Sequence, residues 1–414
     1  MTVSVPALVD HLFRHASGRV LGSLVRKLGP QHLELAEDAL QESIVRALRV
    51  WPYRGLPDHP EAWIRRVAYN QALDVLRREG RREPWDSGYD ELAAPADDDV
   101  LAMMLLCCRP DISRTGQVAL MLKLVAGFSV QEIARVFLTS EATIYQRIGR
   151  ARKAIAGAAD AQVVAWPSDQ RVDALLPALY LLFNEGYAMT SGDRHVSGEL
   201  CQEAIRLTRI VADWNELDWP DVDALLALLL LQAARIPGRV GPAGDILTLA
   251  EQDRNLWDRR LIDEGIDLLN LSARGGELTS YHLQAGIAAA HCLAQSYAET
   301  DWNLILDHYD GLLDLEGSAV VELNRAVAYA MVHGPAAGLA ELDHRLDASA
   351  LDGYALFHAT VGELAARSGH RPRAREGYTR ARDLVRSAPE QRLIERRLAC
   401  MVDDPISEFD GACP

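Results

Sequence analysis

The sequence predicts an all-α fold, and three observations carry that prediction. Apolar residues recur with the 3.6-residue period of a helix in the N-terminal part, and from residue 171 to about residue 400 helical periods are the only regular pattern. The periodic stretches are interrupted at glycine and proline pairs, such as Gly29-Pro30, Pro237-Gly238 and Gly334-Pro335. The chain of 414 residues is 49% hydrophobic, which is enough to build the cores of two or three domains.

Charge is unevenly distributed along the chain, although the net value is −16. Residues 1–82 carry a net charge of +4, residues 83–108 carry −7, residues 109–159 carry +5, and residues 160–414 carry −18. Each basic block could contact a polyanion. The acidic C-terminal part should be repelled by nucleic acid, so we expect it to contact a protein or a small molecule.

The sequence also indicates where the protein works. No apolar run reaches the ~18 residues that a membrane-crossing helix needs, and the N-terminal residues lack the pattern of a signal peptide. The six cysteines form no CxxC pair and no zinc-finger spacing, so reduced thiols are expected. These features predict a cytoplasmic protein that does not contact the membrane.

Three helices are expected before residue 82. The first spans residues 5–29 and ends at Gly29-Pro30. The third occupies residues 60–78, within the segment Asp58–Arg82, because Pro60 suits a first helical position and Asp58 or His59 can cap it. The second spans residues 33–50, with an outer face that includes Asp38, Gln41 and Glu42 and an inner face of Leu33, Ala36, Leu40, Ile44, Ala47 and Leu48.

The helix over residues 60–78 has an unusual polar face. One arc is apolar, whereas the other side holds a tryptophan among polar and charged residues: Trp63, Arg66, Asn70, Asp74, Arg77 and Arg78. An aromatic ring among cations suits stacking on an unpaired base while the cations hold phosphates. The alternative is a solvated charged face with Trp63 half packed on a neighbour, and this helix alone does not decide between the two.

A second candidate site follows an acidic linker over residues 83–100. Two apolar helices, residues 101–108 and 115–126, precede SVQEIARVF and SEATIYQRIGRARKAI, which form a helix-turn-helix pattern with Ser140 as N-cap. In the second helix of this pattern, Ile144, Ile148, Ala151 and Ile155 align on one side. The other side can enter a DNA major groove with Thr143, Gln146, Arg147, Arg150 and Lys153. The alternative is an ordinary α-hairpin with a charged face.

The remaining chain is expected to be a helical repeat domain. After a linker over residues 160–170, helices fill residues 171–401, and residues 402–414 form a tail. AVAYAMVHGP (326–335) is similar to VGELAARSGHRP (361–372) at an offset of 35 residues. A helix-turn-helix period of this length suggests an α-solenoid with tetratricopeptide-like packing.

Taken in order, these motifs resemble a known family. AEDALQESIVRAL (36–48), PEAWIRRVAYNQALDVLRR (60–78) and EIARVFLTSEATIYQRIGRAR (132–152) are similar to segments of bacterial extracytoplasmic-function sigma factors, which are promoter-recognition subunits of RNA polymerase. LYLLFNEGYAMT and the helices after it resemble a subgroup with a tetratricopeptide-like C-terminal extension. The resemblance implies that residues 1–82 are sigma region 2, residues 101–159 are region 4, and residues 171–401 are a regulatory domain.

The resemblance also implies roles for the candidate residues. Asp38, Gln41 and Glu42 would face core RNA polymerase. The polar face that begins at Trp63 would recognise the −10 element of promoter DNA, and the face from Thr143 to Lys153 would recognise the −35 element. The fused C-terminal domain would govern activity. Its charge leaves three roles open: it could fold against the basic blocks and mask them, add a second contact with the polymerase, or bind a protein or small-molecule partner in a helical groove.

Two rival interpretations remain. One is a stand-alone helix-turn-helix transcription regulator with a tetratricopeptide-like sensor domain. The other is an enzyme in the C-terminal part, which is disfavoured because GxSxG, HExxH and glycine-rich phosphate loops are absent from the sequence. The spacing of His282, His291 and Cys292 does not align them on one helix face, so no metal, no cofactor and no catalytic residue is expected.

Overall fold

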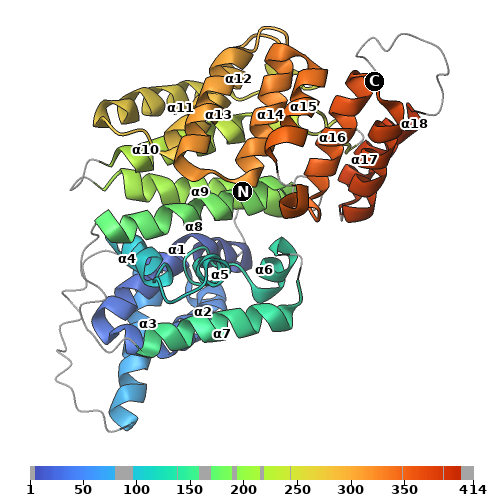
Figure 1. Cartoon of the computed structure of the whole chain (residues 1–414). Coiled ribbons are helices and arrows are strands. Elements are labelled where there is room, and N and C mark those ends of the chain that lie inside the picture. Colours follow the sequence, from blue (N-terminus) through green and yellow to red (C-terminus); the bar gives the residue numbers. More distant parts are fainter. Residues whose placement is uncertain are drawn as a thin grey trace. The chain divides into compact units, whose positions relative to one another are not determined.

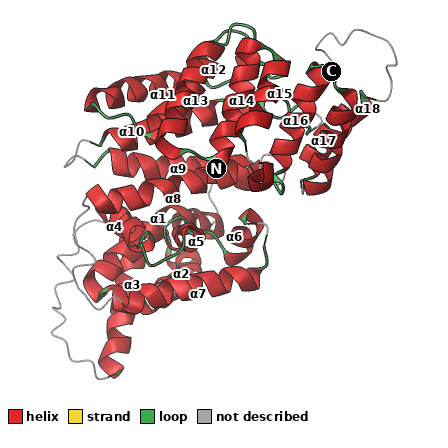
Figure 2. Ribbon diagram, viewed as in Figure 1, coloured by secondary structure: helices red, strands yellow, loops and turns green. Residues whose placement is uncertain are grey.

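The computed structural model of the protein describes residues 5–79, 97–137, 139–157, 169–188, 194–214, 219–242, 244–346, 348–385 and 387–401. The regular structure of these residues is helical throughout, apart from one isolated antiparallel bridge between Val240 and Ile246 (Figure 2). The predicted all-α fold is therefore confirmed. The expected tail 402–414, most of the linker 83–100 and most of the linker 160–170 lie outside the described residues.

The chain divides into two compact units, one of residues 1–185 and 206–214, the other of residues 186–205 and 215–414 (Figure 1). The helices of the first unit are α1 (Val5–Leu28), α2 (Leu33–Arg54), α3 (Pro60–Arg78), α4 (Asp97–Cys107), α5 (Arg114–Leu124), α6 (Val130–Val136), α7 (Glu141–Gly157) and most of α8 (Asp169–Ala188). A 3-10 turn, η1 (Pro30–His32), joins α1 to α2.

Glycine and proline set the ends of the first three helices. Gly29 and Gly55 adopt φ angles of 89° and 82°, which side-chain-bearing residues rarely tolerate, and they end α1 and α2. Pro60 occupies the first turn of α3, where its missing N–H costs nothing. Leu24, Trp51 and Ile64 lie in the core that the three helices share. Leu48 differs from the sequence prediction, because it is exposed rather than inward-facing.

Helix α4 begins at Asp97, so the acidic run before residue 100 lies in its first turn rather than in the linker. Carboxylates are favourable at this positive end of a helix. Asp99 is buried and forms an ion pair of 3.1 Å with Arg26 of α1. The two helices approach so closely that a Cβ on Gly22 would lie 2.2 Å from the Asp99 carbonyl oxygen. The N-terminal helices and the α4–α7 segment therefore share one packed interface.

The second unit is a succession of antiparallel helices. Its helices are part of α9 (Arg194–Ala212), then α10 (Pro220–Ala234), α11 (Arg259–Ser272), α12 (Ser280–Leu293), α13 (Trp302–Glu316), α14 (Ala319–His333), α15 (Pro335–Arg345), α16 (Ala355–Arg367), α17 (Arg371–Leu384) and α18 (Ala388–Ala399). Short 3-10 turns lie at Ile236–Gly238, Arg254–Leu256, Ala273–Gly275 and Ala348–Leu351. From α12 onward each helix packs on the next in the chain, as in an α-solenoid.

The two segments that resemble each other in sequence form equivalent helix pairs. Residues 326–335 end α14 and lead into α15, and residues 361–372 end α16 and lead into α17. Each pair closes on a buried glycine: Gly338 of α15 lies against Ala330 of α14, and Gly377 of α17 lies against Gly362 of α16. Close packing of small residues therefore occurs in both helix pairs.

Four cysteines are free and buried: Cys107, Cys108, Cys201 and Cys292. Cys400, which directly follows α18, is instead disulfide-bonded, with a partner outside the described residues. The expectation of reduced thiols therefore fails for Cys400, because the spacing of the cysteines carries no information about which of them meet in space.

Candidate nucleic-acid interface

Helix α3 presents the polar face that the sequence predicted. Arg66, Asn70, Asp74, Arg77 and Arg78 are all exposed, and the opposite face buries Ile64, Ala68, Ala72 and Leu76 in the core. Asp74 and Arg77 form an exposed ion pair of 3.6 Å, one helical turn apart. An exposed pair contributes at most about 1 kcal/mol to stability, so both groups remain accessible to another partner.

Trp63 is half-buried, and its ring packs edge-on against Trp51 of α2, with 5.4 Å between the ring centroids. Such a contact holds the indole in one orientation at the edge of the polar face. This geometry matches the alternative of a tryptophan half packed on a neighbour, and part of the ring remains open to solvent.

Helix α2 carries a mixed polar and apolar surface. Asp38, Gln41 and Glu42 are exposed, as expected for a docking face. Val45 and Leu48 lie on the same helix and leave 38% and 40% of their surface open to solvent. Sequence reasoning missed these two residues as surface groups, although Val45 falls outside the inward-facing arc. Singly exposed aliphatic side chains are common on protein surfaces, and a protein partner could cover these two.

The helix-turn-helix is formed by α6 and α7. Ser129 and Glu132 close a capping box at the start of α6: the Ser129 N–H donates to Glu132 Oε2 at 2.8 Å, and the Glu132 N–H donates to Ser129 Oγ at 3.1 Å. Ser140 receives a hydrogen bond from the Thr143 N–H at 3.2 Å and caps α7. The helix buries the apolar side that the sequence predicted: Ile144, Ile148, Ala151 and Ile155.

The opposite side of α7 is open. Gln146, Arg150 and Lys153 are exposed, whereas Thr143 and Arg147 are half-buried. The Arg147 guanidinium lies 5.5 Å from the centre of the Phe137 ring, so this cation also packs on α6. Tyr145 is 61% exposed and was not singled out from the sequence, although its position next to Gln146 places it near the same surface.

One residue of the cationic cluster on α7 faces inward. Arg152 donates from Nη2 to Glu37 Oε1 of α2 at 2.7 Å, and Glu37 is buried beside the exposed Asp38. Burial raises the pKa of Glu37, and the neighbouring Arg152 partly opposes that effect. Sequence reasoning did not identify this pair, because nothing local links two residues that are 115 positions apart.

His282, His291 and Cys292 have structural surroundings. His282 Nδ1 receives the Thr279 N–H at 3.2 Å in the capping box of α12. His291 packs edge-on against Trp302, and Cys292 donates to the Leu231 carbonyl oxygen at 3.6 Å. Among the residues that the structure describes, no group of three or more His, Cys, Asp or Glu side chains could hold a metal ion. No described helix is long and apolar enough to span a membrane.

Comparison with known families agrees with the geometry. Residues 12–82 match the model of sigma-70 region 2, residues 114–155 match sigma-70 region 4, and residues 171–273 match a family of unknown function, DUF6596. The chain is 37% identical to the uncharacterized protein R00370 of Rhizobium meliloti over 96% of its own length and 97% of the relative. It is also 30% identical to the ECF RNA polymerase sigma factor SigE of Mycolicibacterium smegmatis over 154 residues.

The chain belongs to the extracytoplasmic-function sigma factors of the sigma-70 family. The match to SigE covers 35% of this sigma factor and 58% of SigE, and the C-terminal extension begins with the DUF6596 match. No solved structure matches this sigma factor. Sigma factors of this family bind DNA and serve transcription initiation, and they are not enzymes. The exposed faces of α3 and α7 therefore lie in regions 2 and 4, respectively.

Proposed function

We propose that this sigma factor binds core RNA polymerase through the exposed face of α2 and directs promoter-specific initiation. The polar face of α3 contacts unpaired bases of the −10 element, and the outer face of α7 contacts the −35 element. The observation that carries the proposal is the placement of the predicted residues. Asn70, Arg78, Gln146, Arg150 and Lys153 are all exposed, while the opposite sides of their helices are anchored in the core.

The chemistry of each face suits its proposed target. Gln146 and Arg150 can form hydrogen bonds to base edges and phosphates in a major groove, and Lys153 can neutralise a phosphate. On α3, the Trp63 ring offers a stacking surface of the kind worth about 1–3 kcal/mol per base. On α2, polar Asp38 and Gln41 border exposed Val45, a combination that suits a protein partner more than a nucleic acid.

We further propose that the C-terminal helical domain governs activity and binds a protein or a small molecule. A stand-alone regulator with a sensor domain is disfavoured, because it gives no role to the polar face of α3 or to the exposed face of α2. The domain boundaries proposed from the sequence, residues 1–82, 101–159 and 171–401, provide the division for testing each role, and we propose the cytoplasm as the place of action.

The test is in vitro transcription with bacterial core polymerase and the full chain. The expected result is promoter-dependent transcripts, and two shortened chains, ending at Ala161 and at Glu185, then report on the C-terminal domain. Two end points are needed because Arg114 of α5 donates to the Ala174 carbonyl oxygen of α8 at 2.9 Å, so the shorter chain also loses a contact of region 4. If neither the full chain nor either shortened chain binds core polymerase or starts transcripts, the proposal is wrong.

A further inference from the structure

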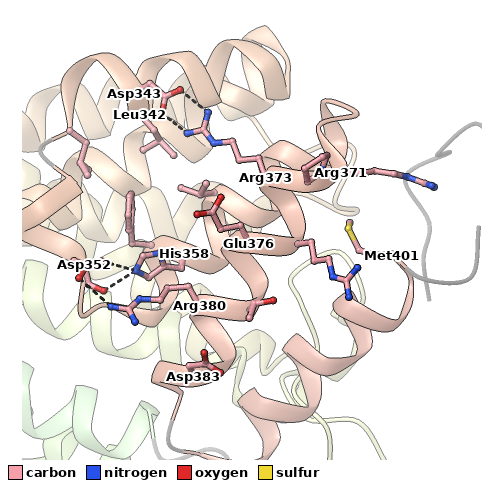
Figure 3. Close-up of a pocket in the computed structure, with 17 residues that line it drawn as sticks. Leu342, Asp343, Asp352, His358, Arg371, Arg373, Glu376, Arg380, Asp383 and Met401 are labelled. Atoms are coloured by element: carbon pink, nitrogen blue, oxygen red, sulfur yellow. Dashed lines mark hydrogen bonds and ion pairs between the residues drawn. The ribbon is translucent and has the colours of Figure 1, made fainter.

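A cavity of about 1090 Å³ opens between α15, α16 and α17 in the C-terminal unit (Figure 3). Its apolar side is made by Leu342, Leu346 and Phe357, all of them buried. Met401, which follows α18, lies at the edge of the cavity. The cavity therefore has an apolar floor, and the chain segment after α18 begins at its edge.

Most charged groups of the cavity wall are paired with one another. Arg373 of α17 donates to both carboxylate oxygens of Asp343 on α15, at 2.8 and 2.5 Å. This fork lowers the pKa of Asp343 below its usual range. Arg380 donates to Asp352 at 3.2 Å, and His358 Nε2 lies 2.8 Å from the carbonyl oxygen of the same residue. The charges of these pairs are satisfied within the cavity wall, so an occupant must be held by the other lining residues.

Two cations at the cavity remain available. Arg371 and Arg375 lie one helical turn apart on α17 and are exposed, and neither has an ion pair within the described part of the chain. Glu376 is the one lining carboxylate for which no ion pair is recorded there. The α17 segment holds five arginines and two acids, although residues 160–414 as a whole carry a net charge of −18. The lining as a whole holds four arginines and four carboxylates. The unpaired Arg371 and Arg375 are therefore the groups that can hold an anionic occupant, and the apolar floor suits an occupant that also carries apolar side chains.

We propose that residues 402–414 of the same chain bind in this cavity. Their sequence, VDDPISEFDGACP, holds four carboxylates and no lysine or arginine. It also holds Ile406 and Phe409, large apolar side chains that match the apolar floor. The segment starts directly after Met401, so it is tethered at the edge of the cavity, and a short tether supplies an effective concentration on the order of mM. Binding of the tail in this cavity involves the extension alone and does not depend on promoter recognition.

The test uses full-length protein under non-reducing conditions, which keep the disulfide of Cys400 intact. The probe is a fluorescent peptide of residues 402–414 with Cys413→Ser, and its binding is followed by fluorescence anisotropy up to about 1 mM, the scale of the tether's effective concentration. A tail-neutralised full chain carries Asp403→Asn, Asp404→Asn, Glu408→Gln and Asp410→Asn, which weakens the internal competitor. We expect the peptide to bind this chain about tenfold more tightly than it binds the native chain, and to lose affinity as salt is added.

Matched substitutions locate the binding site. In the tail-neutralised chain, Arg371→Glu together with Arg375→Glu should weaken peptide binding by about tenfold or more. Arg274→Glu, an equally exposed cation at the 3-10 turn after α11, should change binding by less than about twofold, the effect expected of a charge far from the site. Absence of peptide binding to the tail-neutralised chain would overturn the inference. Equal binding to the native chain, or equal effects of the cavity and control substitutions, would also overturn it and would point to a separate acidic partner or to non-specific attraction.

Discussion

Arg152 of α7 and Glu37 of α2 form an ion pair that joins sigma region 4 to sigma region 2. The Arg152 Nη2 atom lies 2.7 Å from Glu37 Oε1, and Glu37 is only 7% exposed. The pair therefore connects the helix proposed to contact the −35 element with the helix proposed to dock on polymerase. In the packed arrangement, Arg152 is engaged by protein rather than free to bind a phosphate.

Removing one partner of this pair should destabilise the first unit. Arg152→Ala leaves the Glu37 carboxylate buried without its cation, so we expect a loss of about 3 kcal/mol in the free energy of unfolding. Urea unfolding followed by tryptophan fluorescence and by circular dichroism measures it. The swapped variant, Glu37→Arg with Arg152→Glu, should recover part of the loss, and Asp38→Asn on the exposed side should have little effect. Equal loss in the single and swapped variants would show that the ion pair does not hold the two regions together.

Substitutions on the outer face of α7 should change the affinity of the protein for DNA and leave its stability unchanged. Arg150→Ala should weaken binding to the −35 element, and the slope of log affinity against log salt should fall by about 1 if the guanidinium contacts a phosphate. Filter binding or anisotropy over a salt series measures both quantities. Arg274→Ala is the control with the same loss of charge at a remote position. Unchanged affinity and slope for Arg150→Ala would remove this residue from the interface.

Two candidate residues of the α3 face, Trp63 and Asn70, should behave differently. Asn70 is exposed, so Asn70→Ala should lower transcription from a promoter with a native −10 element while the unfolding transition stays the same. Trp63 packs on Trp51, so Trp63→Ala should lower both transcription and stability. Run-off transcription and thermal unfolding of the same preparations separate the effects. Full activity in Asn70→Ala would argue against a role in base recognition.

The exposed aliphatic residues of α2 should matter for binding polymerase. Leu48→Asp places a carboxylate on the proposed docking face, and we expect core binding to weaken by about tenfold because the charge must be desolvated. Competition against the native sigma factor for core polymerase measures the change. Val320→Asp, which alters a similarly exposed residue on α14, should leave core binding as it is. If both variants compete as well as the native chain does, the docking face lies elsewhere.

His291 should make the C-terminal unit sensitive to acid. Burial lowers the pKa of His291 from 6.5 to about 3, with Arg235 and Arg254 acting in the same direction. Below pH 6.5, His291 therefore binds a proton in the unfolded chain but not in the folded chain. The free energy of unfolding should fall as the pH drops from 6.5 towards 3. Urea midpoints between pH 8 and pH 4 should fall less steeply in His291→Gln than in the native chain. Parallel pH profiles would show that His291 does not contribute.

Much of the fold follows from local patterns in the sequence. The α6–α7 motif is fully encoded nearby: Ser129 and Glu132 cap one helix, Ser140 caps the next, and the four aliphatic residues of α7 are spaced to face the core. The outward residues of the candidate site follow from the same periodicity, because the direction of a helical side chain is set by its neighbours in the chain. The prediction for Leu48 was wrong, because periodicity shows which residues share a face but not how far the packing partner extends.

The sequence by itself determined the helices, their order, the sigma family and the polar faces of α3 and α7. Only the tertiary structure decided that Arg152 is engaged by Glu37, that Asp99 belongs to a buried pair with Arg26, and that the arginines of α17 border a cavity. The physical reason is the difference between local and long-range interactions. Helix period and capping depend on residues within one or two turns, whereas ion pairs and cavities depend on which helix faces meet after the chain has folded.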